Sequence, residues 1–191
     1  MNDLKHQLLD QILRNAIHFG RFTLTSGIVS HYYIDCRRVT LSAFGAYLTG
    51  NTILDVLEGV DFQAVGGMTV AADPVATAVA VESWHRGRPV NAFIVRKEAK
   101  GHGMHRQVEG ALQAGDRVAV VDDTLTTGGS IVQAIEAVEA AGAQVAAVAV
   151  ILDRQQGGAD RLRELGYPVH SVLTYDDIRE FVDAHRTATP D

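Results

Sequence analysis

Residues 120–130 read VVDDTLTTGGS, and this short stretch decides the fold prediction. Asp122 and Asp123 end an apolar run with the Val-rich composition of a buried strand. Hydroxyl residues and paired glycines follow directly, and the apolar periodicity of residues 129–142 predicts a helix. A strand that turns through glycine into a helix offers unpaired backbone N–H groups and the positive end of the helix dipole. The second half of the stretch therefore suits a phosphate.

The two adjacent carboxylates need a separate explanation, because like charges at contact distance repel by roughly 1 kcal/mol or more. A ligand with hydroxyl groups or a developing positive charge at one end, and a phosphate at the other, would satisfy both halves. A ribose 5-phosphate has this layout. For the TTGG residues alone, a simple strand-to-helix turn is the alternative. The stretch matches neither the G-x-x-x-x-G-K-[ST] loop nor G-x-G-x-x-G, which disfavours nucleoside triphosphatases and dinucleotide enzymes.

Outward from this stretch, short apolar strands alternate with helices. We expect strands at 63–68, 90–95, 117–121, 144–152 and 169–173, and helices at 42–58, 73–85, 129–142 and 159–165, with a last helix near the C-terminus. This order predicts an α/β fold with a central parallel sheet covered by helices on both faces. Such sheets bind ligands beyond the carboxyl ends of their strands.

The first part of the chain, about residues 1–40, has a different order of predicted elements, and we call it the hood. Apolar residues at helical spacing within residues 2–17 predict an amphipathic helix, and residues 21–35 predict a hairpin that turns near Ser26 and Gly27. No linker or repeat divides the chain, so we expect a single domain over residues 1–191, with a frayed tail at about residues 186–191.

The composition limits the partners and the compartment. A net charge of −6 argues against nucleic acid or an acidic membrane surface as a partner, because both require a broad basic surface. No apolar run is long enough to span a membrane. The single cysteine, Cys36, excludes an internal disulfide and is expected to be a packing residue. We therefore expect a cytoplasmic protein.

A cluster of cations interrupts this acidic chain after the strand at 90–95. Six basic or potentially basic residues, opposed only by Glu98, lie close together: Arg96, Lys97, Lys100, His102, His105 and Arg106. A solvated loop is the ordinary interpretation of such a run. Because Gly101 and Gly103 permit movement, we interpret the loop as a flexible lid whose cations suit a pyrophosphate leaving group.

Arg154 is the second cation that the sequence singles out. It follows the predicted strand at 144–152, and its planar guanidinium matches a carboxylate. A surface salt bridge is the alternative. Since the strand is buried and ends beside the acidic stretch, ligand contact is the favoured interpretation.

Residues 118–130 closely resemble the phosphoribosyl diphosphate motif of the type I phosphoribosyltransferases. Residues 93–110, FIVRKEAKGHGMHRQVEG, resemble the catalytic loop of the orotate-specific branch of this family, and residues 151–158, ILDRQQGG, its orotate-holding segment. Residues 21–37 are similar to its N-terminal hairpin. The resemblance spans about residues 4–175. It implies a type I phosphoribosyltransferase fold and transfer of ribose 5-phosphate from 5-phosphoribosyl 1-diphosphate (PRPP) to orotate, with Mg2+ as cofactor.

The resemblance also implies roles for individual residues. Lys100, Asp122 and Asp123 would be catalytic, and Thr126 and Arg154 would hold orotate. Mg2+ would be held mainly through PRPP and water near the two acids. A homodimer is implied, with Lys97 reaching the neighbouring subunit's site. The residues expected to contact PRPP are Arg96, Lys97, Lys100, His102, Asp122, Asp123, Thr124, Leu125, Thr126, Thr127, Gly128, Gly129 and Ser130.

Two departures from the family pattern leave questions open. Many members have a lysine where this chain has Thr25, and another in the loop that reads GGMTVAADP here, at residues 66–74. Backbone amides of residues 67–69 could meet pyrophosphate, or the glycines could simply allow a tight turn. Tyr33 and Ile34 occupy positions near the base in relatives, and core packing is the alternative for both. A transferase for another base, or a regulator without turnover, also fits the central motif alone.

Overall fold

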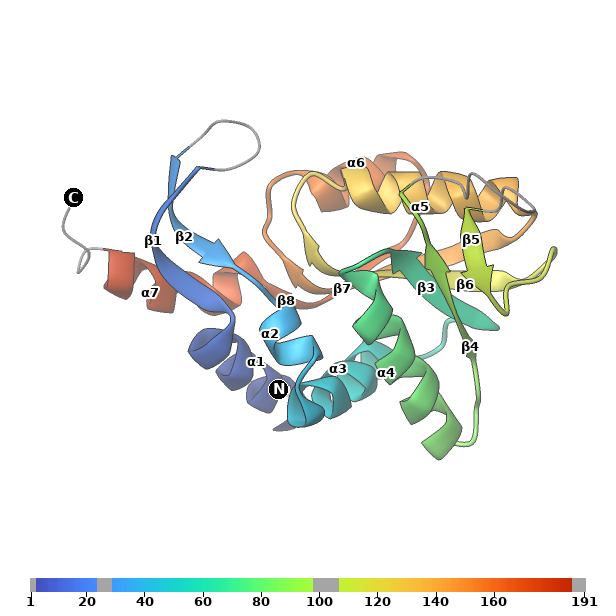
Figure 1. The fold of residues 1–191 in the computed structure, drawn as a ribbon, viewed down its shortest axis with the longest axis horizontal. Helices are drawn as coiled ribbons and strands as arrows, with labels where there is room; N and C mark the ends of the chain where they lie inside the picture. The colour runs from blue at the N-terminus through green and yellow to red at the C-terminus, as the bar shows by residue number, and fades with distance from the viewer. Residues whose placement is uncertain (1–2, 24–28, 98–106, 187–191) are drawn as a thin grey trace.

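The computed structural model describes residues 3–23, 29–97 and 107–186 (Figure 1). The helices are α1 (Asp3–Asn15), α2 (Arg37–Thr40), α3 (Ala43–Val56), α4 (Ala72–His85), α5 (Gly129–Ala140), α6 (Gly158–Glu164) and α7 (Tyr175–Arg186). The strands are β1 (Ile17–Thr23), β2 (Val29–Ile34), β3 (Ala64–Met68), β4 (Asn91–Val95), β5 (Val108–Gly110), β6 (Arg117–Leu125), β7 (Gln144–Asp153) and β8 (Val169–Thr174).

Six strands form the central sheet in the order β5-β4-β3-β6-β7-β8. All neighbouring pairs are parallel except β4 with β5, which are antiparallel. The predicted parallel sheet is therefore confirmed, with one correction at its edge. Because β3, β4, β6 and β7 run in the same direction, their carboxyl ends share one edge of the sheet.

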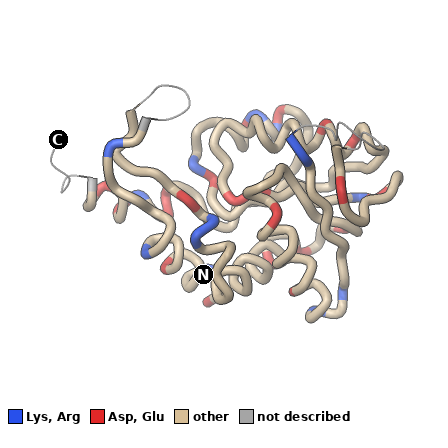
Figure 2. The backbone as a smooth tube through the Cα atoms, viewed as in Figure 1, with Lys and Arg blue, Asp and Glu red and all other residues tan. Residues whose placement is uncertain are grey.

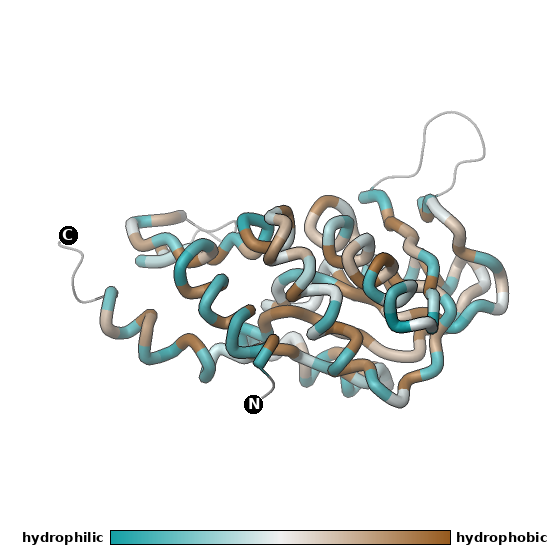
Figure 3. The backbone as a smooth tube through the Cα atoms, turned by 90° about the horizontal axis from the view of Figure 1, so that it is seen from below, coloured by the Kyte–Doolittle hydropathy of each residue, from teal (hydrophilic) through white to brown (hydrophobic). Residues whose placement is uncertain are grey.

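Helices cover both faces of the sheet, and each face has its own core (Figure 1). Alternate residues of β6 point to opposite faces, as the pleat of a strand requires. Ala119 and Val121 pack in the core that includes residues of α1, α3 and α4, whereas Val118 and Val120 pack in the core that includes residues of α5 and α6. Figure 3 shows the apolar segments gathered along the middle of the molecule. Because both faces of the sheet are buried, its strands are apolar along most of their length, and this composition allowed them to be predicted from the sequence.

The hood contains α1 and the antiparallel hairpin of β1 and β2. It lies beside α7 at one end of the molecule (Figure 1). Phe19 of β1 packs against Phe181 of α7, with ring centroids 6.0 Å apart. Leu8 and Ile12 of α1 are fully buried, which explains the apolar spacing found in the sequence. The helix-plus-hairpin prediction is confirmed for the described residues; Ser26 and Gly27 lie outside them.

Beyond shifts of one or two residues at element ends, the structure differs from the sequence prediction in one strand length and in two short elements. The strand expected at 117–121 continues to Leu125, so Asp122 and Asp123 lie inside it rather than beyond its end. The loop expected at 96–110 contains the short strand β5, and α2 was not predicted. Neither element has more than four residues, which is too short for a periodic pattern.

Charged residues are spread over all parts of the fold. Figure 2 shows acidic and basic residues interspersed along the described backbone. None of the described helices has the length and apolar character needed to cross a membrane.

Candidate active site

Asp122 and Asp123 are neighbours whose side chains leave β6 on opposite faces. Asp122 continues the series of Val118 and Val120, and its Oδ2 accepts a hydrogen bond from Ser130 Oγ of α5 at 3.0 Å. Asp123 continues the series of Ala119 and Val121, toward the side where the hood lies. Because the strand extends through both residues, its pleat separates the two carboxylates.

Both carboxyl groups are buried, with 5% of Asp122 and 9% of Asp123 exposed. Burial, followed by the charge of Asp123, raises the pKa of Asp122 to about 7. Hydrogen bonds from the Asp123 amide, at 2.9 Å, and from Ser130 act against this increase. Burial also raises the pKa of Asp123. A cationic ligand would favour the charged form of both groups.

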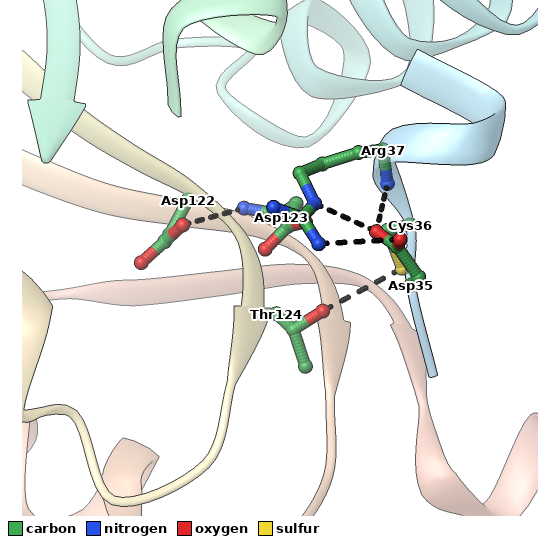
Figure 4. Close-up of polar contacts among 6 residues, drawn as sticks. All are labelled: Asp35, Cys36, Arg37, Asp122, Asp123 and Thr124. Atoms are coloured by element: carbon green, nitrogen blue, oxygen red, sulfur yellow. Dashed lines mark hydrogen bonds and ion pairs between the residues drawn. The ribbon is translucent and has the colours of Figure 1, made fainter. Parts of the chain in front are cut away.

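The segment between β2 and α2 supplies charges next to Asp123 (Figure 4). Arg37 donates to Asp35 through Nε at 2.7 Å and through Nη2 at 3.2 Å. After burial, which raises the pKa of Asp123, the positive charge of Arg37 lowers it and the negative charge of Asp35 raises it, so Arg37 opposes the effect of burial and Asp35 adds to it. Asp35 and Arg37 were not predicted as site residues. The only signal for them in the sequence is that opposite charges lie two positions apart, which allows an ion pair.

Cys36 lies between this pair and β6 (Figure 4). Its Sγ accepts a hydrogen bond from Thr124 Oγ1 at 3.5 Å, and the residue is fully buried. Burial, then the charge of Asp123, raises the pKa of the Cys36 thiol to about 12. A thiol that rarely ionises is a poor nucleophile, which agrees with the packing role expected from the sequence.

Residues 124–130 surround a small cavity of about 140 Å³. Gly128 has φ +78°, a left-handed conformation that glycine adopts without strain, and α5 begins at the next residue. Among the described residues, a methyl group added at Gly129 would meet only Thr127 Oγ1, at 4.0 Å, so the backbone there is open to the cavity. The predicted turn into a helix N-terminus is thus present, with room beside it for a small anion.

Gly158 supports this turn from the start of α6. Its N–H donates to the Thr126 carbonyl at 3.0 Å, and a Cβ atom built there would lie 2.5 Å from the same oxygen. Only a glycine allows α6 to approach the turn so closely. Gly158 lies within residues 151–158, but its role cannot be predicted from the sequence, because the contact with the turn exists only in three dimensions.

Arg154 lies just past the end of β7, on the same edge of the sheet as the cavity. Its N–H donates to the Leu125 carbonyl at 2.9 Å, which places it beside the end of β6. From the sequence we expected the strand before Arg154 to end beside the acidic stretch; the register pairs Asp122 with Val150 and Leu125 with Asp153, so Arg154 lies beyond Leu125 rather than beside Asp122. Thr126, which follows Leu125, is half-buried next to this position. Thr126 and Arg154, the two predicted orotate contacts, are thus close in the fold.

The predicted cationic loop begins at the carboxyl end of β4. Arg96 is half-buried, its N–H donates to the Gln107 carbonyl at 2.9 Å, and its Nη1 lies 3.5 Å from Glu109 Oε1. Lys97 is exposed. Lys100 and His102 lie outside the described residues. The strand order places the end of β4 two strands away from Asp122, with the end of β3 between them.

The glycines of β3 have a packing role rather than the tight-turn role considered above. Cβ atoms at Gly66 and Gly67 would lie 2.2 Å from the Phe93 carbonyl oxygen and 2.0 Å from that of Val121. The Thr69 N–H donates to the Val95 carbonyl at 2.8 Å, so this amide already has an acceptor. Thr69 Oγ1 also donates to Asp73, at 2.6 Å.

Tyr33 and Ile34 have different environments, although they are neighbours. Ile34 is 7% exposed and belongs to the core, whereas Tyr33 is 39% exposed, with its ring 5.8 Å from that of Phe22. Core packing is therefore the role that the fold gives Ile34. The hairpin residue in contact with Arg154 is instead Tyr32, whose hydroxyl is 3.0 Å from Arg154 Nη2.

Asp122 and Asp123 are the acidic residues of the site that could act as ligands for Mg2+. Among the described residues, no cluster of three or more His, Cys, Asp or Glu is arranged to hold a metal ion. Mg2+ often binds through only one or two carboxylates together with substrate oxygens and water. Asp122 and Asp123 fit that mode of binding, since both are oxygen donors at the edge where a phosphorylated substrate would lie.

A sugar phosphate placed along the end of β6 and its turn uses the acids, the cavity and the helix N-terminus together. The family model for the phosphoribosyl transferase domain matches residues 93–183, which include all these features. Fold and site therefore define a phosphoribosyltransferase. The chain is 48% identical to the orotate phosphoribosyltransferase of Streptomyces avermitilis over 176 residues, 92% of this chain and 96% of the relative. It belongs to the orotate phosphoribosyltransferase family.

Solved structures agree with this assignment. The crystal structure of Mycobacterium tuberculosis orotate phosphoribosyltransferase in complex with PRPP has a TM-score of 0.79 and 37% sequence identity, covering 92% of this chain and 98% of that chain. The Fe(III) dicitrate complex of the enzyme from the same organism has a TM-score of 0.83 and 41% identity over the same shares. The predicted type I phosphoribosyltransferase fold is confirmed.

Proposed function

We propose that this chain transfers ribose 5-phosphate from PRPP to N1 of orotate, giving orotidine 5'-phosphate and pyrophosphate in pyrimidine nucleotide synthesis. The observation that carries the proposal is the continuity of the site. One segment contains the two buried acids and the cavity of residues 124–130, and Arg154 lies beside it, just past the end of the neighbouring strand β7. The relative crystallised with PRPP has the same fold.

The carboxylates act on the sugar. In a glycosyl transfer, positive charge develops on the ribose ring as the bond to the leaving group breaks. Asp122 and Asp123 hold the ribose hydroxyls and stabilise this charge from the two faces of β6. Their burial strengthens the interaction, because the local dielectric is low.

The turn after β6 binds the 5'-phosphate. Amides at the start of α5, near Gly128 and Gly129, donate to its oxygens together with the backbone N–H of Ser130, and the hydroxyls of Thr126 and Thr127 add further donors. Ser130 Oγ already donates to Asp122, so this residue connects the phosphate end of the site with the acid end.

The cations after β4 act on the leaving group. We propose that Arg96, Lys97, Lys100 and His102 contact the diphosphate, and that Lys100 stabilises its charge as it departs. Thr126 and Arg154 hold the orotate, with the Arg154 guanidinium facing the carboxylate. Mg2+, bound mainly through PRPP oxygens and water near Asp122 and Asp123, would neutralise charge on the diphosphate.

A homodimer is proposed on the basis of an exposed apolar surface. Tyr47 of α3, Val70, and Val81 of α4 are each at least 46% exposed and line a groove of about 720 Å³. An apolar surface of this kind is typical of a protein interface. A second copy is the proposed occupant, with Lys97 of one subunit reaching the partner's site. We also propose a cytoplasmic location, which a chain with a single free thiol suits.

Turnover of purified protein tests the proposed reaction. With PRPP and Mg2+ present, we expect orotate to disappear as orotidine 5'-phosphate and pyrophosphate form in equal amounts. Turnover of hypoxanthine instead would indicate a purine enzyme, and PRPP binding without turnover would indicate a regulator. Omission of Mg2+ tests the cofactor separately.

The dimer is tested by mixing two inactive variants, Lys97→Ala and Asp123→Asn. If Lys97 acts across the interface, mixing restores activity, because every heterodimer then contains one site with both residues intact. Mixed variants that stay inactive, although they form dimers in sedimentation experiments, would contradict the role of Lys97. A Val81→Glu variant should weaken the dimer.

A further inference from the structure

We infer that Tyr32 of the hood is a positioning residue that orients Arg154 toward the orotate carboxylate, and that Tyr175 holds Tyr32 in place. The inference rests on the proposed function, because it takes orotate as the ligand of Arg154. It assigns a specific part in base recognition to two tyrosines that the sequence motifs did not single out.

The contact joins two distant parts of the chain. Arg154 Nη2 donates to the Tyr32 hydroxyl at 3.0 Å, across 122 positions of sequence. The guanidinium carbon of Arg154 also lies 5.3 Å from the centroid of the Tyr32 ring, within the range of a cation–π interaction. The Tyr32 hydroxyl thus fixes the position of Nη2, and the Tyr32 ring packs against the guanidinium group.

The remaining donors of Arg154 include one that is not satisfied by the protein. Arg154 Nε is buried and has no hydrogen-bond partner within the described part of the chain. Leaving a buried donor unpaired costs roughly 1–3 kcal/mol, and more when the group is charged. A planar carboxylate placed against this side of the guanidinium would supply the missing acceptor. Because Tyr32 holds Nη2, the guanidinium of Arg154 keeps one orientation, and its unpaired Nε–H points in a fixed direction.

The backbone of Arg154 is fixed independently of its side chain. Its N–H donates to Leu125, and the next residue, Gln155, has φ +53°, an uncommon conformation for a residue other than glycine. The Gln155 N–H donates to Asp153 Oδ1 at 2.8 Å, and its side chain donates to Asp176 at 3.0 Å. These bonds hold the backbone in place. The long Arg154 side chain could still point in several directions, and the contact with Tyr32 fixes one of them.

Tyr175 completes the arrangement from the first residue of α7. The helix α7 contacts β2, the strand that contains Tyr32, and burial followed by the nearby Tyr32 hydroxyl raises the pKa of Tyr175. Both rings pack against the core that contains residues of the hood. Arg179 lies over the Tyr175 ring at 5.9 Å. Tyr32 is therefore held between the end of β7 and the start of α7, which connects the hairpin of the hood with the base-binding edge.

Steady-state kinetics of Tyr32→Phe test the inference, because this variant keeps the ring and removes only the hydroxyl. We expect KM for orotate to rise about tenfold, as for loss of one hydrogen bond to a charged group. The values of kcat and KM for PRPP should stay within about twofold of the parent. Tyr175→Phe should have a smaller effect of the same kind. Tyr167→Phe is the matched control, since its hydroxyl bonds to the exposed Glu139 at 2.9 Å.

A second readout separates positioning from general stability. Uracil, which is orotate without the carboxylate, serves as a competitive probe. Tyr32→Phe should weaken orotate binding and leave uracil inhibition unchanged, whereas a merely structural role would weaken both equally. An unchanged KM for orotate, or equal losses for the two ligands, would overturn the inference. If the parent protein does not turn over orotate at all, the proposed function fails instead.

Discussion

The hydroxyl of Ser130 donates to the carboxylate of Asp122 at 3.0 Å and thereby joins the first turn of α5 to the end of β6. Asp123, the next residue, faces the hood and the charge of Arg37. The strand therefore gives each acid its own electrostatic environment. Ser130 of α5 contacts one of them, and Arg37 of the hood acts on the other.

The first prediction concerns Asp122 and pH. Its pKa is raised from 3.8 to about 7, so the folded protein binds this proton more tightly than the unfolded chain does. The stabilising contribution is fully present below pH 3.8 and is lost as pH rises toward 7. For Asp122→Asn we expect the free energy of unfolding to fall less between pH 5 and 8 than in the parent, by up to about 1.4 kcal/mol per pH unit.

Urea unfolding at several pH values measures this difference. Asp61→Asn is the control for loss of one charge, because the Asp61 side chain is 76% exposed. Asp122→Asn should also stabilise the ligand-free protein above pH 7 while reducing turnover. Parallel curves for Asp122→Asn and the parent would contradict the prediction.

The second prediction concerns Arg37. Its charge opposes the effect of burial on Asp123, so removing that charge should raise the pKa of Asp123 further. In Arg37→Gln, the acid side of the pH profile of kcat/KM should therefore move to higher pH. Arg37→Lys keeps the charge and should move it less. The prediction is wrong if both variants reproduce the parent profile.

The third prediction compares two neighbouring glycines. Gly129→Ala places a methyl group in open space beside the cavity, so KM for PRPP should rise at least about tenfold while the melting temperature stays nearly constant. Gly128→Ala forces alanine to φ +78° and should cost about 1 kcal/mol of stability. Calorimetry and PRPP titration of both variants distinguish the two effects. A destabilised Gly129→Ala protein would refute this division of roles.

The fourth prediction concerns Gly158. In Gly158→Ala, the new methyl group would lie 2.5 Å from the Thr126 carbonyl oxygen and 2.6 Å from Leu125 Cδ1, so the turn must shift. We expect a loss of roughly 1–3 kcal/mol in stability and weaker PRPP binding. Thermal unfolding and PRPP titration check both effects, and parent-like values in both would show that the turn tolerates the added group.

Much of the fold could be predicted because it depends on local patterns. Buried parallel strands have continuous apolar sequences and helices have apolar residues at helical spacing, so most elements were found near their correct positions. β5 was missed because it has three residues and is defined by its ladder with β4. The length of β6 was underestimated because two charged residues lie inside it, buried at the site.

By itself, the sequence determined the order along the chain of most strands and helices. It also determined the segment in which acids, hydroxyls and glycines follow one another. These features are local, since they depend on residues a few positions apart. Only the tertiary structure decided that Tyr32 contacts Arg154, that the charge of Arg37 acts on Asp123, and that Gly158 supports the turn after β6. Each of these contacts joins separate elements, and the packing of the hood and of α6 against the sheet edge brings them together.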